Sequence, residues 1–524
     1  MEVLQEKADE APEKEIFIQR FVDGGRRSLT YKELLNRSSL VAKHLISEGI
    51  VVGDNIAIIG PNSIEWIIGQ FAIFSSGAIA VQINKTAESF VETMELLKTL
   101  KIKAVLLDPE SNREYVQAME EYFITGKPQR DQPRVLLLQK SALSSLTSLS
   151  DITLTVDEAS VLLPRIQPES SAMIYTTSGS TGFPKMVEMT HMAVVNASYI
   201  AFLGTGGNLS DGTCYNDCLF PWIGGSPIFN ALNGNTRVFV DPPISLMERH
   251  IVTVWNIIMT EQCSNAIFFP HTVLDLIENQ DEIQKLGYQL YGIATGGQLI
   301  NKSLTKICGK LTEKLFVDYG STEVGIVSFT ELSPEMEIGY VGPLLPGYEV
   351  KITGENGGVL DRGSLGEINI RSRWMLKTYR NSSKLNEACF TDGGWFRTGD
   401  IGVISMEDKL FVKGKSADVI KRGGVKVVAS VVEEAMMKLP EIREAVVLSV
   451  PDARLFEEVC ACYVMEVFAH EIELDQICKG SLGDNVLGSS PSLFLRFVNF
   501  PRLKNGKTDK VFLKRLVMER LKQA

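Results

Sequence analysis

A cluster of hydroxyl side chains and glycines is the clearest candidate for chemistry in this sequence. Residues 176–185 read Thr-Thr-Ser-Gly-Ser-Thr-Gly-Phe-Pro-Lys, which combines five hydroxyls, two glycines and one cation. Glycines let the backbone approach a bound anion, and successive N–H groups form a cradle for it. The apolar run at 172–175 predicts a buried strand just before the cluster. We therefore predict a polyphosphate-binding loop, with a flexible Ser/Thr/Gly linker as the alternative. The spacing is not that of the common P-loop.

Four later segments also carry polar side chains between glycines. They are residues 318–323 (Asp-Tyr-Gly-Ser-Thr-Glu), 395–400 (Trp-Phe-Arg-Thr-Gly-Asp), 414–424 and 501–507 (Pro-Arg-Leu-Lys-Asn-Gly-Lys). Read alone, the first could begin a helix with Glu323 near its positive end. The second could be a plain β-turn. Asn505-Gly506 favours a hairpin, so Lys507 alone could be a solvated surface lysine.

Length and composition limit the class of protein. The chain has 524 residues, which is too long for one core and predicts at least two domains. A hydrophobic fraction of 44%, a charged fraction of 22% and a net charge of −11 are typical of a globular protein and argue against nucleic-acid binding. The 8 cysteines form no C-x-x-C pair and the 5 histidines are scattered, so neither a zinc site nor a disulfide framework is expected.

No targeting or membrane-spanning segment is recognisable. The first fifteen or so residues are acidic and polar, unlike a signal or transit peptide, and the chain does not end in the peroxisomal S-K-L signal. The apolar stretch 64–83 is interrupted by polar residues and predicts a buried helix followed by a strand. We therefore expect a cytoplasmic protein without a transmembrane segment, and the oligomeric state stays open.

The hydrophobic pattern predicts an α/β fold. Short apolar runs at 55–59, 78–81, 104–107 and 135–138 alternate with helical patterns, which is typical of parallel strands covered on both faces. Thr30 is placed to cap a helix that follows it. From about 339 to 413, short strands between Gly, Asp and Pro turns predict a small antiparallel β subdomain. After 414 the pattern returns to mixed α and β.

The five polar segments, in their order along the chain, resemble the signatures of the adenylate-forming superfamily. That superfamily contains acyl- and aryl-CoA synthetases, peptide-synthetase adenylation domains and beetle luciferases, and this chain is closest in kind to an acyl-CoA synthetase. The resemblance implies a large N-terminal domain, 1–413, made of two parallel-type αβ subdomains and a small β-barrel-like subdomain at about 339–413. It also implies a small, mobile α+β C-terminal domain, 414–524.

The resemblance further implies a reaction in which a carboxylate attacks the α-phosphate of ATP. Such a transfer depends on positioning and charge neutralisation. The implied catalytic residues are Lys507, Thr322, Glu323 and Lys185, with Glu323 also the ligand of Mg²⁺. Tyr319 would stack on adenine, Asp318 would accept from its amine, and Asp400 would accept from the ribose hydroxyls. The implied nucleotide-binding residues are Thr177, Ser178, Gly179, Ser180, Thr181, Gly182, Gly296, Gly297, Gln298, Asp318, Tyr319, Gly320, Asp400 and Lys415.

Several positions depart from the family pattern. Met186 stands where a glycine usually follows the Pro-Lys pair, and Trp222 takes the place of a gating histidine. Trp222 and Val324 would line the acyl pocket, although Trp222 could equally be a core residue. Lys415 replaces an arginine and keeps its charge without the planar fork, and Ala417 removes a polar hinge side chain. Three residues would border the tunnel for CoA: Arg422, Gly423 and Gly424.

We therefore expect an AMP-forming acid–CoA ligase with ATP, Mg²⁺ and CoA, acting on a hydrophobic fatty or aryl acid. Its partners would be small molecules, namely the acid, ATP and CoA, and not nucleic acid. Two alternatives remain. One is an adenylating enzyme that passes the acyl group to a carrier protein or to a luciferase-like oxidation. The other is a non-catalytic homologue that only binds nucleotide.

Overall fold

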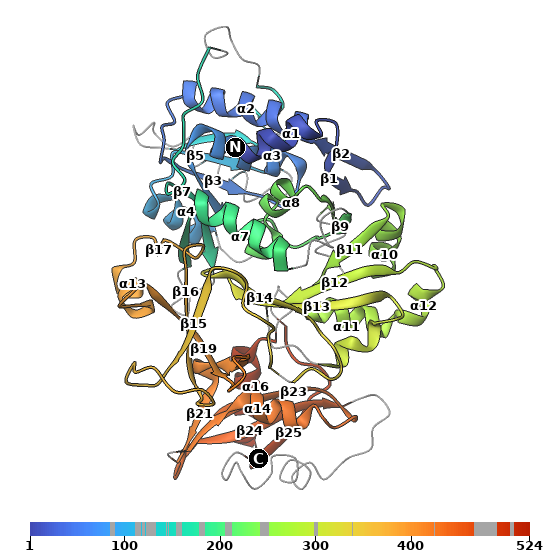
Figure 1. The fold of residues 1–524 in the computed structure, drawn as a ribbon, viewed down its shortest axis with the longest axis vertical. Helices are drawn as coiled ribbons and strands as arrows, with labels where there is room; N and C mark the ends of the chain where they lie inside the picture. Colours follow the sequence, from blue (N-terminus) through green and yellow to red (C-terminus); the bar gives the residue numbers. More distant parts are fainter. Residues whose placement is uncertain are drawn as a thin grey trace.

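The computed structural model describes residues 1–83, 90–109, 117, 121, 133–142, 144, 146–152, 160–177, 184–204, 212–241, 251–297, 302–337, 339–423, 425–465, 490–502 and 508–523. Its described strands form three larger sheets and two small ones, and the two small sheets lie at the end of the long axis that carries the C-terminus (Figure 1). Among the described helices, none is long and apolar enough to cross a bilayer.

The first sheet carries the strand that leads into the predicted phosphate loop. Its order is β17-β8-β7-β4-β3-β5-β6. The middle strands run parallel, whereas β8 is antiparallel to β7 and β17 is antiparallel to β8. The bounds are β3 (Asn55–Ile59), β4 (Ile79–Ile83), β5 (Ala104–Leu107), β6 (Arg134–Leu137), β7 (Ser171–Thr177), β8 (Lys185–Thr190) and β17 (Thr378–Tyr379).

The second sheet has the order β14-β13-β12-β11-β9-β10-β1-β2. Strands β13 to β1 run parallel and the two edge strands are antiparallel. The bounds are β1 (Glu15–Arg20), β2 (Arg26–Thr30), β9 (Thr213–Tyr215), β10 (Thr236–Val240), β11 (Cys263–Ile267), β12 (Leu290–Gly296), β13 (Thr312–Ser321) and β14 (Gly325–Glu331).

Helices cover these two sheets, and their ends follow the sequence signals. In α2 (Tyr31–Ser47), the Thr30 hydroxyl accepts from the Glu33 N–H while the Glu33 side chain accepts from the Thr30 N–H, so the predicted cap is confirmed as a full capping box. Every residue of α3 (Ile64–Ser76) is buried, and the helix ends at Gly77 with φ +77°. The apolar stretch 64–83 is thus a buried helix followed by β4, as predicted.

Several other helices are described in this part. They are α1 (Glu2–Glu10), α4 (Phe90–Thr99), α7 (His191–Gly204), α8 (Ile228–Asn233), α10 (Ile251–Thr260), α11 (Pro270–Glu278) and α12 (Gln280–Gln284), with 3₁₀ turns η2 (Ile223–Gly225) and η3 (Lys302–Ile307).

The third sheet confirms the antiparallel β subdomain. Its order is β15-β16-β19-β18, and β20 pairs with the other part of β19. The bounds are β15 (Tyr348–Thr353), β16 (Gly366–Ser372), β18 (Phe390–Thr391), β19 (Trp395–Ile404) and β20 (Leu410–Lys415). Two elements within 339–413 are unexpected. Strand β17 leaves to join the first sheet, and α13 (Ser383–Cys389) follows it.

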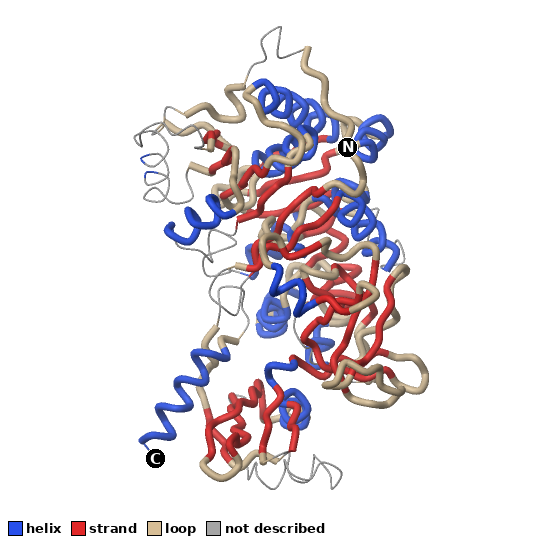
Figure 2. The backbone as a smooth tube through the Cα atoms, turned by 90° about the vertical axis from the view of Figure 1, so that its left-hand side faces the viewer, coloured by secondary structure: helices blue, strands red, loops and turns tan. Residues whose placement is uncertain are grey.

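The C-terminal elements lie together at one end of the molecule, with the last helix beside them (Figure 2). Hairpin β21-β22 and the sheet β23-β24-β25 are accompanied by two helices, so the predicted α+β character is confirmed. The bounds are η4 (Ser416–Asp418), β21 (Val419–Arg422), β22 (Val425–Val428), α14 (Ala429–Met436), β23 (Ile442–Asp452), β24 (Phe456–Met465), β25 (Leu493–Arg496) and α16 (Lys510–Gln523). The boundary at 413/414 stays a prediction; strand β20 continues across it to Lys415.

Candidate active site

The predicted phosphate loop connects two antiparallel strands. Thr177 at the end of β7 pairs with Lys185 at the start of β8, so the loop closes a hairpin. The buried Thr176 hydroxyl donates to the Gln82 carbonyl of β4 at 2.9 Å, which fixes the end of β7 in the sheet. The predicted residues Ser178, Gly179, Ser180, Thr181 and Gly182 lie outside the described residues, as do Gln298, Gly424 and Lys507.

Met186, which replaces the usual glycine, is a core residue. It is 5% exposed and belongs to an apolar cluster that includes Ile59, Val81 and Ile174 of neighbouring strands. Successive side chains of a strand point to opposite faces, so a buried Met186 leaves Lys185 on the other face of β8. The thioether therefore fills the core on one face of this sheet.

Thr322, Glu323 and Val324 form the turn between β13 and β14. Ser321 and Gly325 pair across this turn, so residues 318–323 are strand and turn, and the alternative of a helix start is wrong. The backbone of the turn is anchored twice: the Tyr348 hydroxyl donates to the Val324 carbonyl at 2.7 Å, and the Leu376 N–H donates to the Glu323 carbonyl at 2.7 Å. Val324, predicted for the acyl pocket, has its side chain buried in the main core cluster.

Two predicted catalytic side chains meet at one tyrosine. The Tyr379 hydroxyl donates to Glu323 Oε1 at 2.9 Å, and Lys185 Nζ lies 5.7 Å from the centroid of the same ring. Burial and the neighbouring carboxylate both raise the pKa of Tyr379, so the phenol stays protonated and remains a donor. Among the described residues, no hydrogen bond to Glu323 Oε2 is recorded, which leaves that oxygen able to serve as a ligand.

Asp318 lies beside Gly296, one of the predicted nucleotide-binding residues. It pairs with Gly296 in the parallel register of β12 and β13, and a Cβ on Gly296 would overlap the Asp318 carboxyl group. Gly297 has φ +81°, a conformation that favours glycine. Burial raises the pKa of Asp318 to about 7. The carboxyl group therefore changes charge near neutral pH.

A second cluster joins three residues predicted for the nucleoside. Asp400 is 8% exposed; its Oδ2 accepts from the Tyr319 hydroxyl at 2.9 Å and its Oδ1 lies 2.5 Å from Lys415 Nζ. The Asp400 N–H donates to the Thr398 hydroxyl at 3.0 Å, which orients the carboxylate. Burial and Asp400 raise the pKa of Tyr319. Residues 397–400 lie within β19, so the plain β-turn alternative is wrong. Each carboxylate oxygen has a second lone pair, so Asp400 can still accept from a diol.

Trp222 lies in the loop that follows β9. Its ring contacts the ring of Phe269 edge to face, with centroids 5.8 Å apart. Trp222 is only half-buried, which favours a pocket wall over a core position.

The loop that carries Trp222 is held by Arg237, whose fully buried guanidinium donates to the carbonyls of Asn216, Gly225 and Cys218 at 2.8, 2.6 and 3.1 Å. Burial lowers the pKa of Arg237 to about 10.

The predicted CoA-tunnel residues lie beside the β23-β24 hairpin. Arg422 Nε is 2.7 Å from Glu458 Oε1, so its charge is paired. Gly423 has φ +54°, its N–H donates to the Leu455 carbonyl at 2.9 Å, and a Cβ there would lie 2.8 Å from the Leu455 side chain. Only glycine fits this position without strain.

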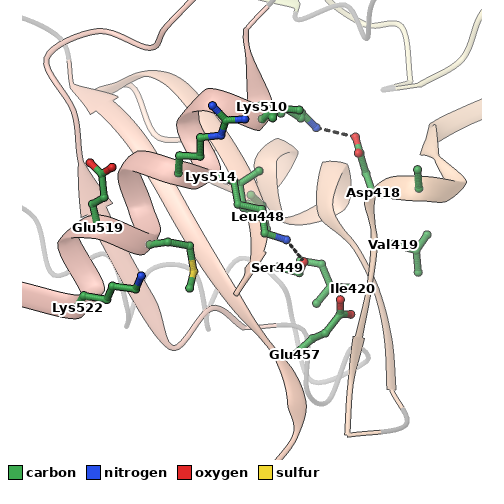
Figure 3. Close-up of a pocket in the computed structure, with 15 residues that line it drawn as sticks. Asp418, Val419, Ile420, Leu448, Ser449, Glu457, Lys510, Lys514, Glu519 and Lys522 are labelled. Carbon is green, nitrogen blue, oxygen red and sulfur yellow. Dashed lines mark hydrogen bonds and ion pairs between the residues drawn. The ribbon is translucent and has the colours of Figure 1, made fainter. Parts of the chain in front are cut away.

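A cavity of about 580 Å³ lies in the C-terminal part between α16, β21 and β23. Lys510 Nζ reaches Asp418 Oδ2 at 2.7 Å across it, and Lys514 Nζ donates to Ser449 Oγ at 2.9 Å (Figure 3). The residues that line it include none of the predicted site residues. The cavity is therefore separate from the candidate site, and Lys510 at its edge is paired with Asp418.

Sequence reasoning missed Tyr379, Asn386 and Arg237. A lone arginine in the apolar strand 236–240 was a usable signal, because a buried charge needs dedicated partners. Nothing in the local pattern distinguishes Tyr379, which is brought to its place by the pairing of β17 with β8. Asn386 in turn has a role only because it bonds the Tyr379 backbone.

Comparisons with known proteins identify the family of this chain. A family model described as AMP-binding enzyme matches residues 4–380. A zebrafish (Danio rerio) protein named medium-chain acyl-CoA ligase ACSF2, mitochondrial, is 26% identical over 540 aligned residues, covering 97% of this chain and 86% of the relative. A Mycobacterium tuberculosis protein named long-chain-fatty-acid–CoA ligase FadD13 is 26% identical over 486 residues, covering 91% of this chain and 90% of the relative.

Solved structures share the whole fold. The anthranilate CoA ligase AuaEII in complex with anthranoyl-AMP superposes with a TM-score of 0.81 at 18% identity, over 98% of this chain and 96% of the other. ATP-bound MatB from Rhodopseudomonas palustris gives 0.79 at 21% identity, over 98% of both chains. The predicted large α/β domain followed by a C-terminal α+β part is thereby confirmed. Because the family model spans most of the chain, the protein belongs to the AMP-binding enzyme family.

Proposed function

We propose that the protein is an ATP-dependent acid–CoA ligase that activates a hydrophobic fatty or aryl acid as its acyl-adenylate, forms the acyl-CoA thioester, and releases AMP and pyrophosphate. The observation that carries the proposal is the convergence of Glu323 and Lys185 on one tyrosine. Asp318 and Tyr319, predicted for adenine, lie in β13, which leads into the turn that contains Glu323. The Tyr319 hydroxyl donates to Asp400 of β19, the residue predicted for the ribose. The names of the medium- and long-chain relatives support CoA as acceptor and an aliphatic acid as substrate.

The chain's own residues would act mainly by positioning. Lys185 provides positive charge beside the phosphate loop, and Asp400 is oriented to accept from ribose hydroxyls. Thr322 offers a hydroxyl next to Glu323 in the same turn. Oriented donors and charges of this kind stabilise a developing phosphoryl charge without a covalent intermediate on the enzyme. Lys507, Arg422, Gly423 and Gly424 keep their predicted roles as part of this proposal.

The residues present suit magnesium as part of the proposal. Glu323 supplies a hard carboxylate oxygen, and the described residues contain no group of three metal-binding side chains. Mg²⁺ typically takes one or two protein carboxylates and completes its shell with water and phosphate oxygens. Bound there, the ion would neutralise phosphate charge. Glu323 is the described residue that we propose would hold it.

The test is a measurement of AMP release by the purified protein with a series of aliphatic acids and benzoate, with and without CoA. Acid-dependent AMP release that CoA stimulates, together with acyl-CoA detected by mass spectrometry, supports the proposal. AMP release that does not change with CoA would favour another acceptor, and no acid-dependent AMP with any acid would favour a non-catalytic homologue.

A cytoplasmic location also stays a proposal. Fluorescence microscopy of a tagged full-length chain tests it against the mitochondrial location in the zebrafish relative's name.

A further inference from the structure

Tyr379 occupies the point where three separate parts of the chain meet. It is 2% exposed and lies in β17, which pairs with β8 through Tyr379 and Val187. Strand β8 begins at Lys185, and the β13–β14 turn contains Glu323. Tyr379 is therefore packed between the phosphate-loop strand and the turn that carries the predicted metal ligand.

The backbone around Tyr379 is tied to both of these elements. The Leu376 N–H donates to the Glu323 carbonyl at 2.7 Å, while the N–H groups of Lys377 and Arg380 each donate at 2.8 Å to carbonyls of β8. Residues 376–380 thus bridge the turn and β8 through main-chain hydrogen bonds. Such bonds set a fixed spacing between the two elements.

A helix further along the chain holds the tyrosine's own backbone. Asn386 of α13 accepts from the Tyr379 N–H and donates to the Tyr379 carbonyl, both at 2.8 Å. Phe396 packs beside the ring at 6.2 Å between centroids. The Tyr379 backbone is held by Asn386 and by the pairing of β17 with β8, and its ring is buried. We therefore expect the side chain to keep one orientation.

The Tyr379 side chain then reaches both predicted catalytic groups. Its hydroxyl donates to Glu323 Oε1 at 2.9 Å, and its ring face lies 5.7 Å from Lys185 Nζ. The Cys389 thiol also contacts this hydroxyl. A hydrogen bond to a charged carboxylate is among the stronger ones, and a cation near an aromatic face adds a weaker attraction.

We infer that Tyr379 is a positioning residue for adenylation: its hydroxyl orients Glu323 toward the metal–nucleotide, and its ring sets the place of Lys185. The inference rests on the proposed function for the identity of the reaction. The two contacts should have different effects, because the Tyr379 hydroxyl acts on the Glu323 carboxylate and the Tyr379 ring acts on the Lys185 ammonium group. Removing the hydroxyl alone should therefore weaken the use of metal–nucleotide without removing the ring's effect on Lys185.

The experiment compares Tyr379→Phe, Tyr379→Leu and wild type in the two half-reactions. Adenylation is measured by acid-dependent exchange of pyrophosphate into ATP, and thioester formation by mixing synthetic acyl-adenylate with CoA. We expect Tyr379→Phe to lower adenylation about tenfold to a hundredfold, as expected for a hydrogen bond to a charged group. Thioester formation should change less than about twofold, since it makes no use of the metal–pyrophosphate side. Tyr379→Leu should in addition raise the KM for ATP.

Tyr31→Phe is the matched control. Tyr31 is 1% exposed and its hydroxyl donates to the Ala231 carbonyl at 2.9 Å, so this variant also loses one buried phenol hydrogen bond. It should keep both half-reactions. Equal losses in both half-reactions of Tyr379→Phe, or losses matched by Tyr31→Phe, would overturn the inference and indicate a general effect on folding.

A double variant separates positioning from packing. If the hydroxyl acts through Glu323, adding Tyr379→Phe to Glu323→Gln should lower the adenylation rate by less than about twofold further, whereas independent effects would multiply.

Binding of Mn²⁺ with a non-hydrolysable ATP analogue, followed by electron paramagnetic resonance, gives a readout that needs no acid. Tyr379→Phe should weaken that binding. If wild type adenylates no acid, the proposed function fails, yet unchanged Mn²⁺–nucleotide binding in Tyr379→Phe would still overturn this inference on its own.

Discussion

We predict that the half-buried carboxyl group of Asp318 makes recognition of adenine depend on pH. Burial raises the pKa of Asp318 from 3.8 to about 7 in the free protein. We expect the ionised carboxylate to accept a hydrogen bond from the adenine amine, which the protonated form does much less well. The perturbation is therefore a change in pH across neutrality, with Asp318→Asn as the comparison.

The size of the effect follows from the ionised fraction. With a pKa of about 7, roughly nine-tenths of Asp318 is ionised at pH 8 and about one-tenth at pH 6. Apparent affinity scales with the fraction of protein that is competent to bind. The affinity for an adenine ligand should therefore fall about tenfold between pH 8 and pH 6.

Adenosine is the suitable probe, because it carries no phosphate that titrates in this range. Calorimetric titrations of the purified protein from pH 6 to pH 8 should show the tenfold loss of affinity. Inosine, which lacks the amine, should show no such slope, and Asp318→Asn should bind adenosine equally at both pH values. A flat profile for wild type, or an unchanged slope in Asp318→Asn, would refute the reasoning.

Four further results are expected. The folded-state pKa of Asp318 lies above its unfolded value, so the contribution of Asp318 to stability is full below about pH 4 and is lost as the pH rises to about 7. Asp318→Asn should therefore stabilise the protein at pH 8 and not at pH 4, which a shift of the unfolding midpoint detects. The gain in the free energy of unfolding should be at most about 4 kcal/mol. Gly296→Ala should weaken adenosine binding because its Cβ would displace the Asp318 carboxyl group, which calorimetry detects. Met186→Ala should lower the free energy of unfolding by about 2–4 kcal/mol in denaturant titrations, since it removes a core side chain. Lys507→Ala should lose adenylation far more than thioester formation from supplied adenylate; equal losses would contradict separate conformations for the two steps.

Most of the large-scale fold could be predicted because it depends on patterns that are local. Buried parallel strands such as β3 and β5 are continuous apolar runs, and the cap at Thr30 lies next to the helix it begins. The predicted order of strands and helices in the first half therefore needed no knowledge of long-range pairing. The antiparallel character of 339–413 was likewise visible in its short strands and turns.

The residues that could not be predicted depend on long-range strand pairing, which local sequence patterns do not encode. Strand β17 has only two residues, Thr378 and Tyr379, and its partner β8 lies almost two hundred residues earlier in the chain. The sequence gives no local sign of that pairing, so neither Tyr379 nor its support by Asn386 could be predicted. For the same reason Tyr319 was expected only to stack on adenine, whereas its hydroxyl is bonded to Asp400 of β19.

In the proposed reaction, a carboxylate oxygen of the acid attacks the α-phosphate of ATP before the thioester forms. The most direct test uses an acid labelled with ¹⁸O in both carboxylate oxygens, with products analysed by mass spectrometry. We expect one ¹⁸O in AMP, one in the thioester carbonyl and none in pyrophosphate. AMP without label, or label in pyrophosphate or inorganic phosphate, would contradict the acyl-adenylate pathway.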